Sequence, residues 1–269
     1  MPEIDPEIFE NLRDFIYEKS GIFFEISKKY LLENKLTKRI QELRLRNYED
    51  YLRFLKTNKD ELCNLFDAIT INETYFFRHL QQIEVFSDIV VSELLKQKPI
   101  LNIWSAACSS GEEAYTLAIA LVEKYGANIP ARILASDISI EVLEKAKNGV
   151  YNEYALKELS NALKQKYFDI EKNTYRIKSF VKNKVVFRQV NIVEDKDLNT
   201  VGNMDIIFLR NVLIYFNNES RQKVIDKIYN HILNKNGYLF LGATESISRL
   251  NTNLKLVHFK QALAYKKED

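Results

Sequence analysis

The sequence is poor in glycine, proline and cysteine, with seven, four and two of these residues among 269. Cys63 and Cys108 lie far apart and form no CxxC pair, so we expect neither a disulfide framework nor a metal site. No apolar run approaches the roughly 20 residues that a membrane-spanning helix needs. The N-terminus also lacks the basic and then apolar pattern of a signal peptide. These absences predict a soluble protein of the cytoplasm.

Neither sign of charge is in excess, because 39 Lys and Arg face 37 Asp and Glu, for a net charge of +2. Nucleic-acid-binding domains are usually strongly basic, so we expect no nucleic-acid partner. Hydrophobic residues make up 46% and charged residues 28% of the chain, as in ordinary globular proteins. Nothing in the sequence calls for an obligate assembly, and a monomer is predicted.

The first 75 residues are predicted to form an all-α domain. In the segment 6–20 apolar residues recur at helical spacing, and Gly21 follows as a stop signal. Further helices are expected over 28–46, 48–56 and 59–69. A linking helix within 76–98 joins this part to the remainder of the chain.

Residues 99–269 show a different pattern, in which short β-branched runs alternate with amphipathic stretches. This alternation predicts an α/β domain with a mostly parallel, Rossmann-like sheet. The runs 238–241 and 257–264 lack a full crossover helix between them, which predicts an antiparallel sheet edge. Residues 151–186 are predicted to be an inserted β-subdomain, with a helix at 161–166 and a hairpin within 173–186. The other expected strands are 100–105, 131–136, 185–190 and 204–209, and the expected helices are 112–124, 140–147 and 219–234.

A loop of small residues follows the first expected strand and contains Gly111. Small side chains at the carboxyl end of a parallel strand let a ligand approach the backbone. The loop lacks the GxGxxG pattern, and Glu112 and Glu113 would repel a phosphate from the following helix. The combination favours a nucleoside without phosphates that carries a positive group, whereas the alternative is an ordinary tight turn.

Polar residues also follow the later strands. Asp137 ends the second strand, 26 residues after Gly111, a spacing at which an acid can accept both ribose hydroxyls. Its alternative role is to cap the next helix. Asn191 could reach an adenine edge or be a simple loop amide. Arg210 and Asn211 follow a buried strand, where substrate meets cofactor in such sheets; the alternative is a salt-bridged loop.

Further upstream, a polar and aromatic cluster over 70–78 ends in Arg78 at the domain junction. An arginine there could hold a carboxylate through a bidentate pair. The adjacent Phe76 and Phe77 are expected to serve mainly in packing between the domains.

Taken in order, these segments resemble the CheR family of chemotaxis receptor glutamate methyltransferases. The matching blocks run over essentially the whole chain, and five in register make the resemblance specific. They are the Thr-x₅-Phe-Phe-Arg cluster at 70–78, the Trp-Ser-Ala-Ala-Cys-Ser-Ser-Gly-Glu-Glu-x-Tyr block at 104–115, Ala-Ser-Asp-Ile at 135–138, Arg-Asn-Val-Leu-Ile-Tyr-Phe at 210–216 and Gly-Ala-Thr-Glu-Ser at 242–246. Two shorter matches lie at 142–146 and 149–151.

The resemblance implies a Rossmann-like methyltransferase that uses S-adenosylmethionine to methylate glutamate side chains of chemoreceptors, leaving S-adenosylhomocysteine. It assigns Asn72, Thr74 and Arg78 to the methionine end of the cofactor and Glu112 to its amino group. Asp137 is assigned to the ribose, and Asn191 and Ile192 to the adenine side. The remaining cofactor-binding assignments are Ala106, Gly111, Arg210 and Asn211, and the implied catalytic residues are Tyr215, Arg210 and Asn211.

A local excess of basic residues occurs within 28–46, with seven Lys or Arg against two acids. Such a run is commonly a solvated helix face. In the context of the resemblance it favours contact between Lys38, Arg39 and Arg46 and an acidic receptor helix.

Two departures from the family pattern matter. Ala114 stands where proline is common, which should leave function intact because proline there only presets a first helical turn. The expected hairpin is short and lacks a glycine-rich turn, so we predict that no tether to a receptor C-terminal pentapeptide is needed.

Two other functions remain open from sequence. An NAD-dependent dehydrogenase shares the fold class, but the missing phosphate-binding glycines count against it. A non-enzymatic S-adenosylmethionine-binding module would retain the cofactor site without turnover. Arg210, Asn211 and Tyr215 favour an active enzyme.

Overall fold

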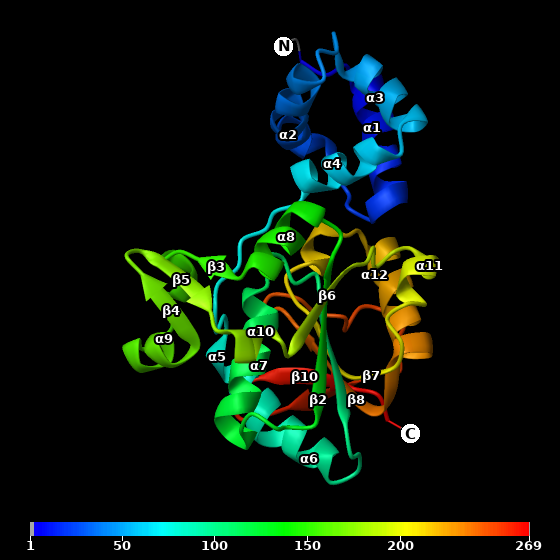
Figure 1. Cartoon of the computed structure of the whole chain (residues 1–269). Coiled ribbons are helices and arrows are strands. Elements are labelled where there is room, and N and C mark those ends of the chain that lie inside the picture. Colours follow the sequence, from blue (N-terminus) through cyan, green and yellow to red (C-terminus); the bar gives the residue numbers. More distant parts are fainter. Residues whose placement is uncertain (1–2, 269) are drawn as a thin grey trace.

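The computed structural model describes residues 3–268, so the outer ends of the predicted domains, at residues 1 and 269, lie outside the described range. The first helices form a lobe at one end of the molecule (Figure 1). Helix α1 begins where Asp5 accepts a hydrogen bond from the backbone N–H of Glu7, and it ends at Gly21, whose φ is 73°. The lobe consists of α1 (Pro6–Ser20), α2 (Lys29–Glu42), α3 (Tyr48–Thr57) and α4 (Asp60–Ile69).

The lobe has a hydrophobic core of its own. Phe9, Leu12 and Ile16 of α1 pack with apolar side chains of the other three helices. Within this core Glu61 is only 3% exposed. Its carboxylate accepts two hydrogen bonds of 2.6 Å from Arg39. The lobe therefore combines an apolar core with a buried ion pair.

A linking helix connects the lobe to the sheet, with a π-helical segment (Val85–Val90) between α5 (Leu80–Glu84) and α6 (Val91–Leu95). It begins directly after His79, which has a left-handed φ of 59°. Its apolar side packs on the sheet, where the Phe86 and Phe208 rings meet edge to face at 5.3 Å.

The large sheet confirms the predicted fold class. Its strand order is β6-β2-β1-β7-β8-β10-β9, parallel from β6 to β8 and antiparallel from β8 to β9. The strands are β1 (Leu101–Ala106), β2 (Ala131–Asp137), β6 (Val185–Gln189), β7 (Met204–Leu209), β8 (Leu233–Leu241), β9 (Lys255–His258) and β10 (Leu263–Lys266). The connecting helices are α7 (Glu112–Tyr125), α8 (Ile140–Asn148), α11 (Asp195–Leu198) and α12 (Asn218–Lys227), the last continued by a π-helical turn (Ile228–Ile232).

Alternation along the strands produces two cores, one on each face of the sheet. Ile206 and Phe208 of β7 join the core that contains α7 and the linking helix. Ile207 and Leu209 join the core that contains α12. Because successive strand residues point to opposite faces, one continuous apolar strand supplies both layers.

The inserted segment forms a second, antiparallel sheet with the order β3-β5-β4, which projects from the side of the molecule (Figure 1). Its elements are β3 (Val150–Tyr151), α9 (Asn161–Tyr167), β4 (Phe168–Glu171), β5 (Thr174–Ile177) and α10 (Ser179–Lys182). The predicted hairpin over 173–186 is therefore wrong in register. The turn lies between β4 and β5, and Val185 already belongs to the large sheet.

Two boundaries near the C-terminus also differ from prediction. The expected helix over 219–234 stops at Ile232, because β8 begins immediately afterwards. The expected single strand over 257–264 is two strands, β9 and β10, paired with each other. No helix among the described residues is long and apolar enough to cross a membrane.

Candidate functional site

A cavity of about 440 Å³ lies between the helical lobe and the carboxyl ends of the parallel strands. Its floor comes from the loops after β1, β2, β6 and β7, and its roof from the segment after α1 and from α2. Parallel strands bring their carboxyl ends to one edge, which is where open α/β sheets bind ligands. The predicted site residues that line it are Asn72, Thr74, Arg78, Asp137, Asn191, Ile192, Arg210, Asn211 and Tyr215.

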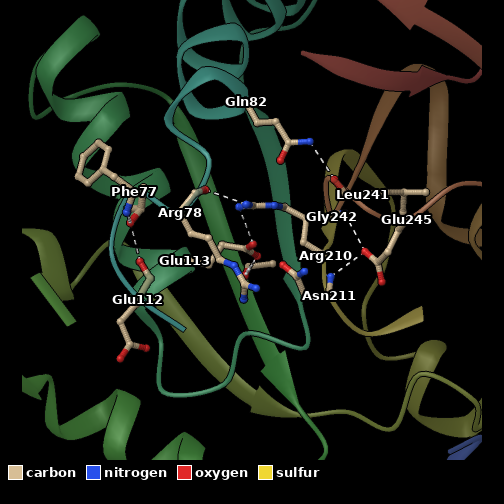
Figure 2. Close-up of polar contacts among 12 residues, drawn as sticks. Phe77, Arg78, Gln82, Glu112, Glu113, Arg210, Asn211, Leu241, Gly242 and Glu245 are labelled. Atoms are coloured by element: carbon tan, nitrogen blue, oxygen red, sulfur yellow. Dashed lines mark hydrogen bonds and ion pairs between the residues drawn. The ribbon is translucent and has the colours of Figure 1, made fainter. Parts of the chain in front are cut away.

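A cluster of charged residues forms one end of the cavity (Figure 2). The buried Arg210 donates to a carboxylate oxygen of Glu113 at 3.1 Å and to the backbone oxygen of Arg78 at 2.7 Å. Burial lowers the pKa of Arg210, and the neighbouring Glu113 carboxylate opposes that shift. Glu113 also accepts from the Ser105 hydroxyl at 2.6 Å. The arrangement holds two cations and a carboxylate at the cavity wall.

Two donors in this cluster have no hydrogen-bond partner among residues 3–268. The Nε atoms of Arg78 and Arg210 are both buried without a hydrogen bond. A buried donor left unsatisfied costs roughly 1–3 kcal/mol. Both side chains line the cavity, so an acceptor bound there could satisfy them. This wall is therefore suited to an anionic group such as a carboxylate.

Asp137 lies at the end of β2 and is 5% exposed. Its two oxygens accept backbone N–H groups of Ser109 at 2.8 Å and Ser139 at 3.0 Å. Burial raises the pKa of Asp137, and these backbone hydrogen bonds oppose the rise. Asp137 thus lines the cavity and also orders the loops after β1 and β2. It does not cap α8 as the alternative expected, because Ser139 is the residue that accepts the N–H of Val142 at the start of that helix.

The Asn191 side chain makes two hydrogen bonds that the sequence did not predict. Its side-chain amide donates to the backbone oxygen of Lys19, in the helical lobe, at 2.6 Å. Its side-chain oxygen accepts from the N–H of Val193 at 3.2 Å. Asn191 therefore connects the two halves of the molecule at the cavity wall.

Tyr215 and Asn211 lie on the turn after β7. The backbone oxygen of Tyr215 accepts from the N–H of Phe23 in the helical lobe at 3.0 Å. Burial raises the pKa of the half-buried Tyr215 phenol above its ordinary value of 10.0, so the side chain is a neutral hydroxyl at neutral pH. Asn211 has a left-handed φ of 59°.

The structure separates the two adjacent glutamates. Glu113 lines the cavity, whereas Glu112 does not, and in Figure 2 the Glu112 carboxylate points away from Arg210. Glu112 is instead held by the Ser110 hydroxyl at 2.8 and 3.0 Å, and burial raises its pKa to about 7. Of the two glutamates, Glu113 is therefore the one whose carboxylate reaches the cavity.

Two other predicted cofactor residues also stand behind the cavity wall. Ala106 is fully buried in β1, and the lining residue is its neighbour Ala107. Gly111 has a φ of 92°, and a Cβ atom there would lie 2.9 Å from the Ala146 Cβ. Gly111 therefore allows close packing of the loop against α8.

The three basic residues predicted to meet a receptor are not among the cavity-lining residues. Lys38 and Arg46 are 85% exposed and pair with Glu42 and Asp50 respectively. Arg39 is directed inward to Glu61. The residues of α2 that do line the cavity are Leu31 and Lys35, together with Lys28 just before the helix.

Sequence reasoning missed the roof of the cavity. Ser20, the last residue of α1, lines the cavity from the helical lobe together with Ile22, Phe23 and Phe24, which follow the helix. No local motif marks them as site residues; only Gly21 signals that the chain turns here. Among residues 3–268, no group of three or more His, Cys, Asp or Glu side chains is placed to hold a metal ion.

Comparisons with known proteins show which family this chain belongs to. A family model described as "CheR methyltransferase, SAM binding domain" matches residues 72–263, and one described as "CheR methyltransferase, all-alpha domain" matches residues 7–70. The chain belongs to the CheR methyltransferase family. Its class is therefore the S-adenosylmethionine-dependent methyltransferases, as the resemblance predicted.

Several relatives match over nearly their whole length. Chemotaxis protein methyltransferase 2 of Vibrio cholerae is 36% identical, with 96% of this chain and 92% of that protein covered. Chemotaxis protein methyltransferase of Borreliella burgdorferi is 34% identical, with 94% and 93% covered. Chemotaxis protein methyltransferase 1 of Pseudomonas aeruginosa is 33% identical, with 96% and 97% covered.

Proposed function

We propose that this protein transfers the methyl group of S-adenosylmethionine to glutamate side chains of chemoreceptors, forming methyl esters. The observation that carries this is the charged end of the interdomain cavity. It offers unsatisfied arginine donors and a carboxylate side by side, which matches the carboxylate and ammonium of an amino acid. A dinucleotide would need a phosphate-binding glycine loop, which this site lacks.

The cofactor fits the residues present. Arg78, through its unpartnered Nε, would hold the methionine carboxylate, and Glu113 would accept from the amino group. Asp137 would accept from the ribose, with Asn191 and Ile192 beside the adenine. Asn72 and Thr74 would border the methionine end. When bound, S-adenosylmethionine supplies a methyl group on a positively charged sulfur.

The protein needs no strong base for the chemistry. A glutamate carboxylate has a reference pKa of about 4.3 and is ionised at neutral pH. Its oxygen can attack the methyl carbon directly, so the protein must hold the reactants in line, an effect of roughly 7–11 kcal/mol. Burial raises the pKa of Tyr215, which suits a hydroxyl that orients the carboxylate. Arg210 and Asn211 form the adjoining floor.

Receptor contact is proposed for the exposed side of α2 and for Arg46, which follows the helix. Lys38 and Arg46 present their charges to solvent, and basic groups there would speed the encounter with an acidic helix. Arg39 forms an ion pair with the buried Glu61, so its side chain stabilises the helical lobe and is less available to a receptor. Reversing Lys38 alone therefore tests receptor contact without breaking the buried pair.

The setting of the reaction is also part of the proposal. We infer that the protein works in the cytoplasm as a monomer and that no receptor pentapeptide tether is required. The short turn between β4 and β5 supports this last point. We also propose three units: residues 1–75, a linker over 76–98 and a methyltransferase domain over 99–269, with 151–186 as its insertion. The separate cores of the lobe and the sheet support this division.

The test is transfer of labelled methyl from S-adenosylmethionine to a chemoreceptor cytoplasmic fragment, followed by mild alkali. Label released as methanol is the expected result, because a carboxyl methyl ester is alkali-labile. Alkali-stable label would indicate methylation of nitrogen and overturn the substrate assignment. Cofactor binding without transfer to receptors would favour a non-enzymatic binding module.

A further inference from the structure

Glu245 occupies the turn after β8 and gathers three backbone amides on one carboxylate. Its Oε2 atom accepts the N–H groups of Asn211 and Gly242, both at 2.7 Å. Its Oε1 atom accepts the N–H of Ile214 at 3.2 Å. Figure 2 shows this side chain reaching across from the β8 turn to Asn211. Charge-assisted bonds of this kind are about twice as strong as neutral ones.

These amides belong to two neighbouring turns. Asn211 and Ile214 follow β7, whereas Gly242 follows β8. Asn211 has a φ of 59°, a conformation that costs most side chains about 1–2 kcal/mol. The bond from its N–H to Glu245 helps to hold it there. The carboxylate therefore clamps the turn that carries the predicted catalytic residues to the adjacent strand.

Gly242 is required for this close approach. A Cβ atom at this position would lie 2.6 Å from the Glu245 Oε2 atom and 3.0 Å from the Asn211 backbone nitrogen. Any side chain would push the carboxylate away or move the Asn211 turn. Gly242 and Glu245 thus depend on each other.

We propose that Glu245 is a positioning residue for methyl transfer, acting through Asn211 and the turn that ends at Tyr215. This inference rests on the proposed function. The hydrogen bonds of the Arg210 side chain go to Glu113 and the Arg78 backbone oxygen, and Glu245 acts on Arg210 only through its charge, the smallest influence on the Arg210 pKa. Losing Glu245 therefore releases the turn without dissolving the charged end of the cavity.

The kinetic consequence follows from which contacts are kept. Arg78, Glu113 and Asp137 make no hydrogen bond to Glu245 among those of the described residues, so most of the proposed cofactor contacts survive. A displacement of about 1 Å at a reacting centre can lower turnover about 100-fold. We therefore expect kcat to fall about 10- to 100-fold while the Kd for S-adenosylhomocysteine changes less than about threefold.

The experiment uses Glu245→Gln and Gly242→Ala in the full chain, each alone and combined. Glutamine keeps the shape of the side chain but turns one acceptor into a donor that faces backbone N–H groups. The matched control is Glu93→Gln, because Glu93 is also partly buried and accepts from Tyr238 and Lys266 at 2.9 and 2.8 Å. Glu93 lies on the linking helix, away from the cavity lining.

Receptor methylation gives kcat, and calorimetry gives the cofactor Kd. Amide hydrogen exchange measures the protection of the backbone N–H groups of Asn211, Ile214 and Gly242. Support requires faster exchange at these amides, lower kcat with near-normal Kd, and a double variant less impaired than the product of the two singles. The control should keep wild-type kcat.

Wild-type turnover in Glu245→Gln, wild-type exchange at these amides, or a loss confined to Kd would each overturn the inference. If Glu245→Gln does not fold, Gly242→Ala carries the same test, because its Cβ displaces the same carboxylate. Exchange rates remain informative without activity. Absence of transfer by the wild-type protein would contradict the proposed function, not the role of Glu245 in holding the turn.

Discussion

The two adjacent glutamates at the start of α7 should differ sharply in their importance for the cofactor. Glu113 lines the cavity and faces Arg210, whereas Glu112 is buried against Ser110. We expect Glu113→Gln to weaken S-adenosylmethionine binding strongly and Glu112→Gln to leave it nearly unchanged. The pair is its own control, because both variants make the same chemical change at consecutive positions.

The expected magnitudes follow from the contacts. A hydrogen bond to a charged group contributes roughly 1.5–3 kcal/mol. Losing the negative charge of Glu113 opposite the ammonium should therefore raise Kd about 10- to 150-fold. Burial raises the pKa of Glu112 to about 7, so about half of this carboxyl is already protonated at neutral pH. A neutral glutamine there should change Kd less than about threefold.

The assay is a calorimetric titration of each folded variant with S-adenosylmethionine or S-adenosylhomocysteine at neutral pH. Thermal unfolding of both variants shows whether the fold is retained, which matters because Glu113 also partners Arg210. The reasoning fails if Glu112→Gln weakens binding as much as Glu113→Gln does. That result would return the amino-group contact to Glu112.

Three other predictions concern stability and turnover. Because the folded-state pKa of Glu112 rises from 4.5 to about 7, its contribution to stability is complete below about pH 4.5 and is lost as pH rises to about 7. Urea unfolding at several pH values should show that Glu112→Gln removes about 2–3 kcal/mol of the loss in unfolding free energy between about pH 4.5 and 7. If the unfolding free energy of this variant falls with pH as steeply as that of the wild type, the prediction is wrong. Arg39→Gln should lower the free energy of unfolding by about 3 kcal/mol, because it removes the cation paired with the buried Glu61 carboxylate, although Tyr51 and Asn64 still donate to it. The exposed Lys38→Gln should change it by less than about 0.5 kcal/mol, and equal losses in urea would refute the buried pair. Tyr215→Phe should lower kcat with little change in cofactor Kd, and unchanged turnover would remove its orienting role.

Much of the architecture could be predicted from local patterns. Helix α1 is specified by Asp5 at its start and Gly21 at its end, and both signals act within a few residues. The alternation of strands and helices predicted the parallel sheet. Once that sheet is accepted, Asp137 and Arg210 must lie at the same edge of it, because carboxyl ends of parallel strands share one edge.

Local patterns do not predict contacts between residues that are far apart in the sequence. The register of the small sheet depends on pairing between β3, β4 and β5, and several turn positions fit the same residues. Likewise, the bond from Asn191 to Lys19 joins residues 172 positions apart. No spacing rule in a single sequence reports a contact of that kind.

The order of strands and helices was enough to predict the edge of the sheet where a ligand binds, and the resemblance of the motifs to a known family implied the methyltransferase. They did not distinguish Glu112 from Glu113, because consecutive helix residues point about 100° apart and the packing of α7 on the sheet decides which one faces the cavity. Nor did they show that Phe23 and Lys35 form the roof or that Arg39 points inward. The roof depends on how the helical lobe docks onto the sheet, and the direction of Arg39 depends on how α2 packs against α4 within the lobe. Both are properties of the packed molecule and not of any short segment.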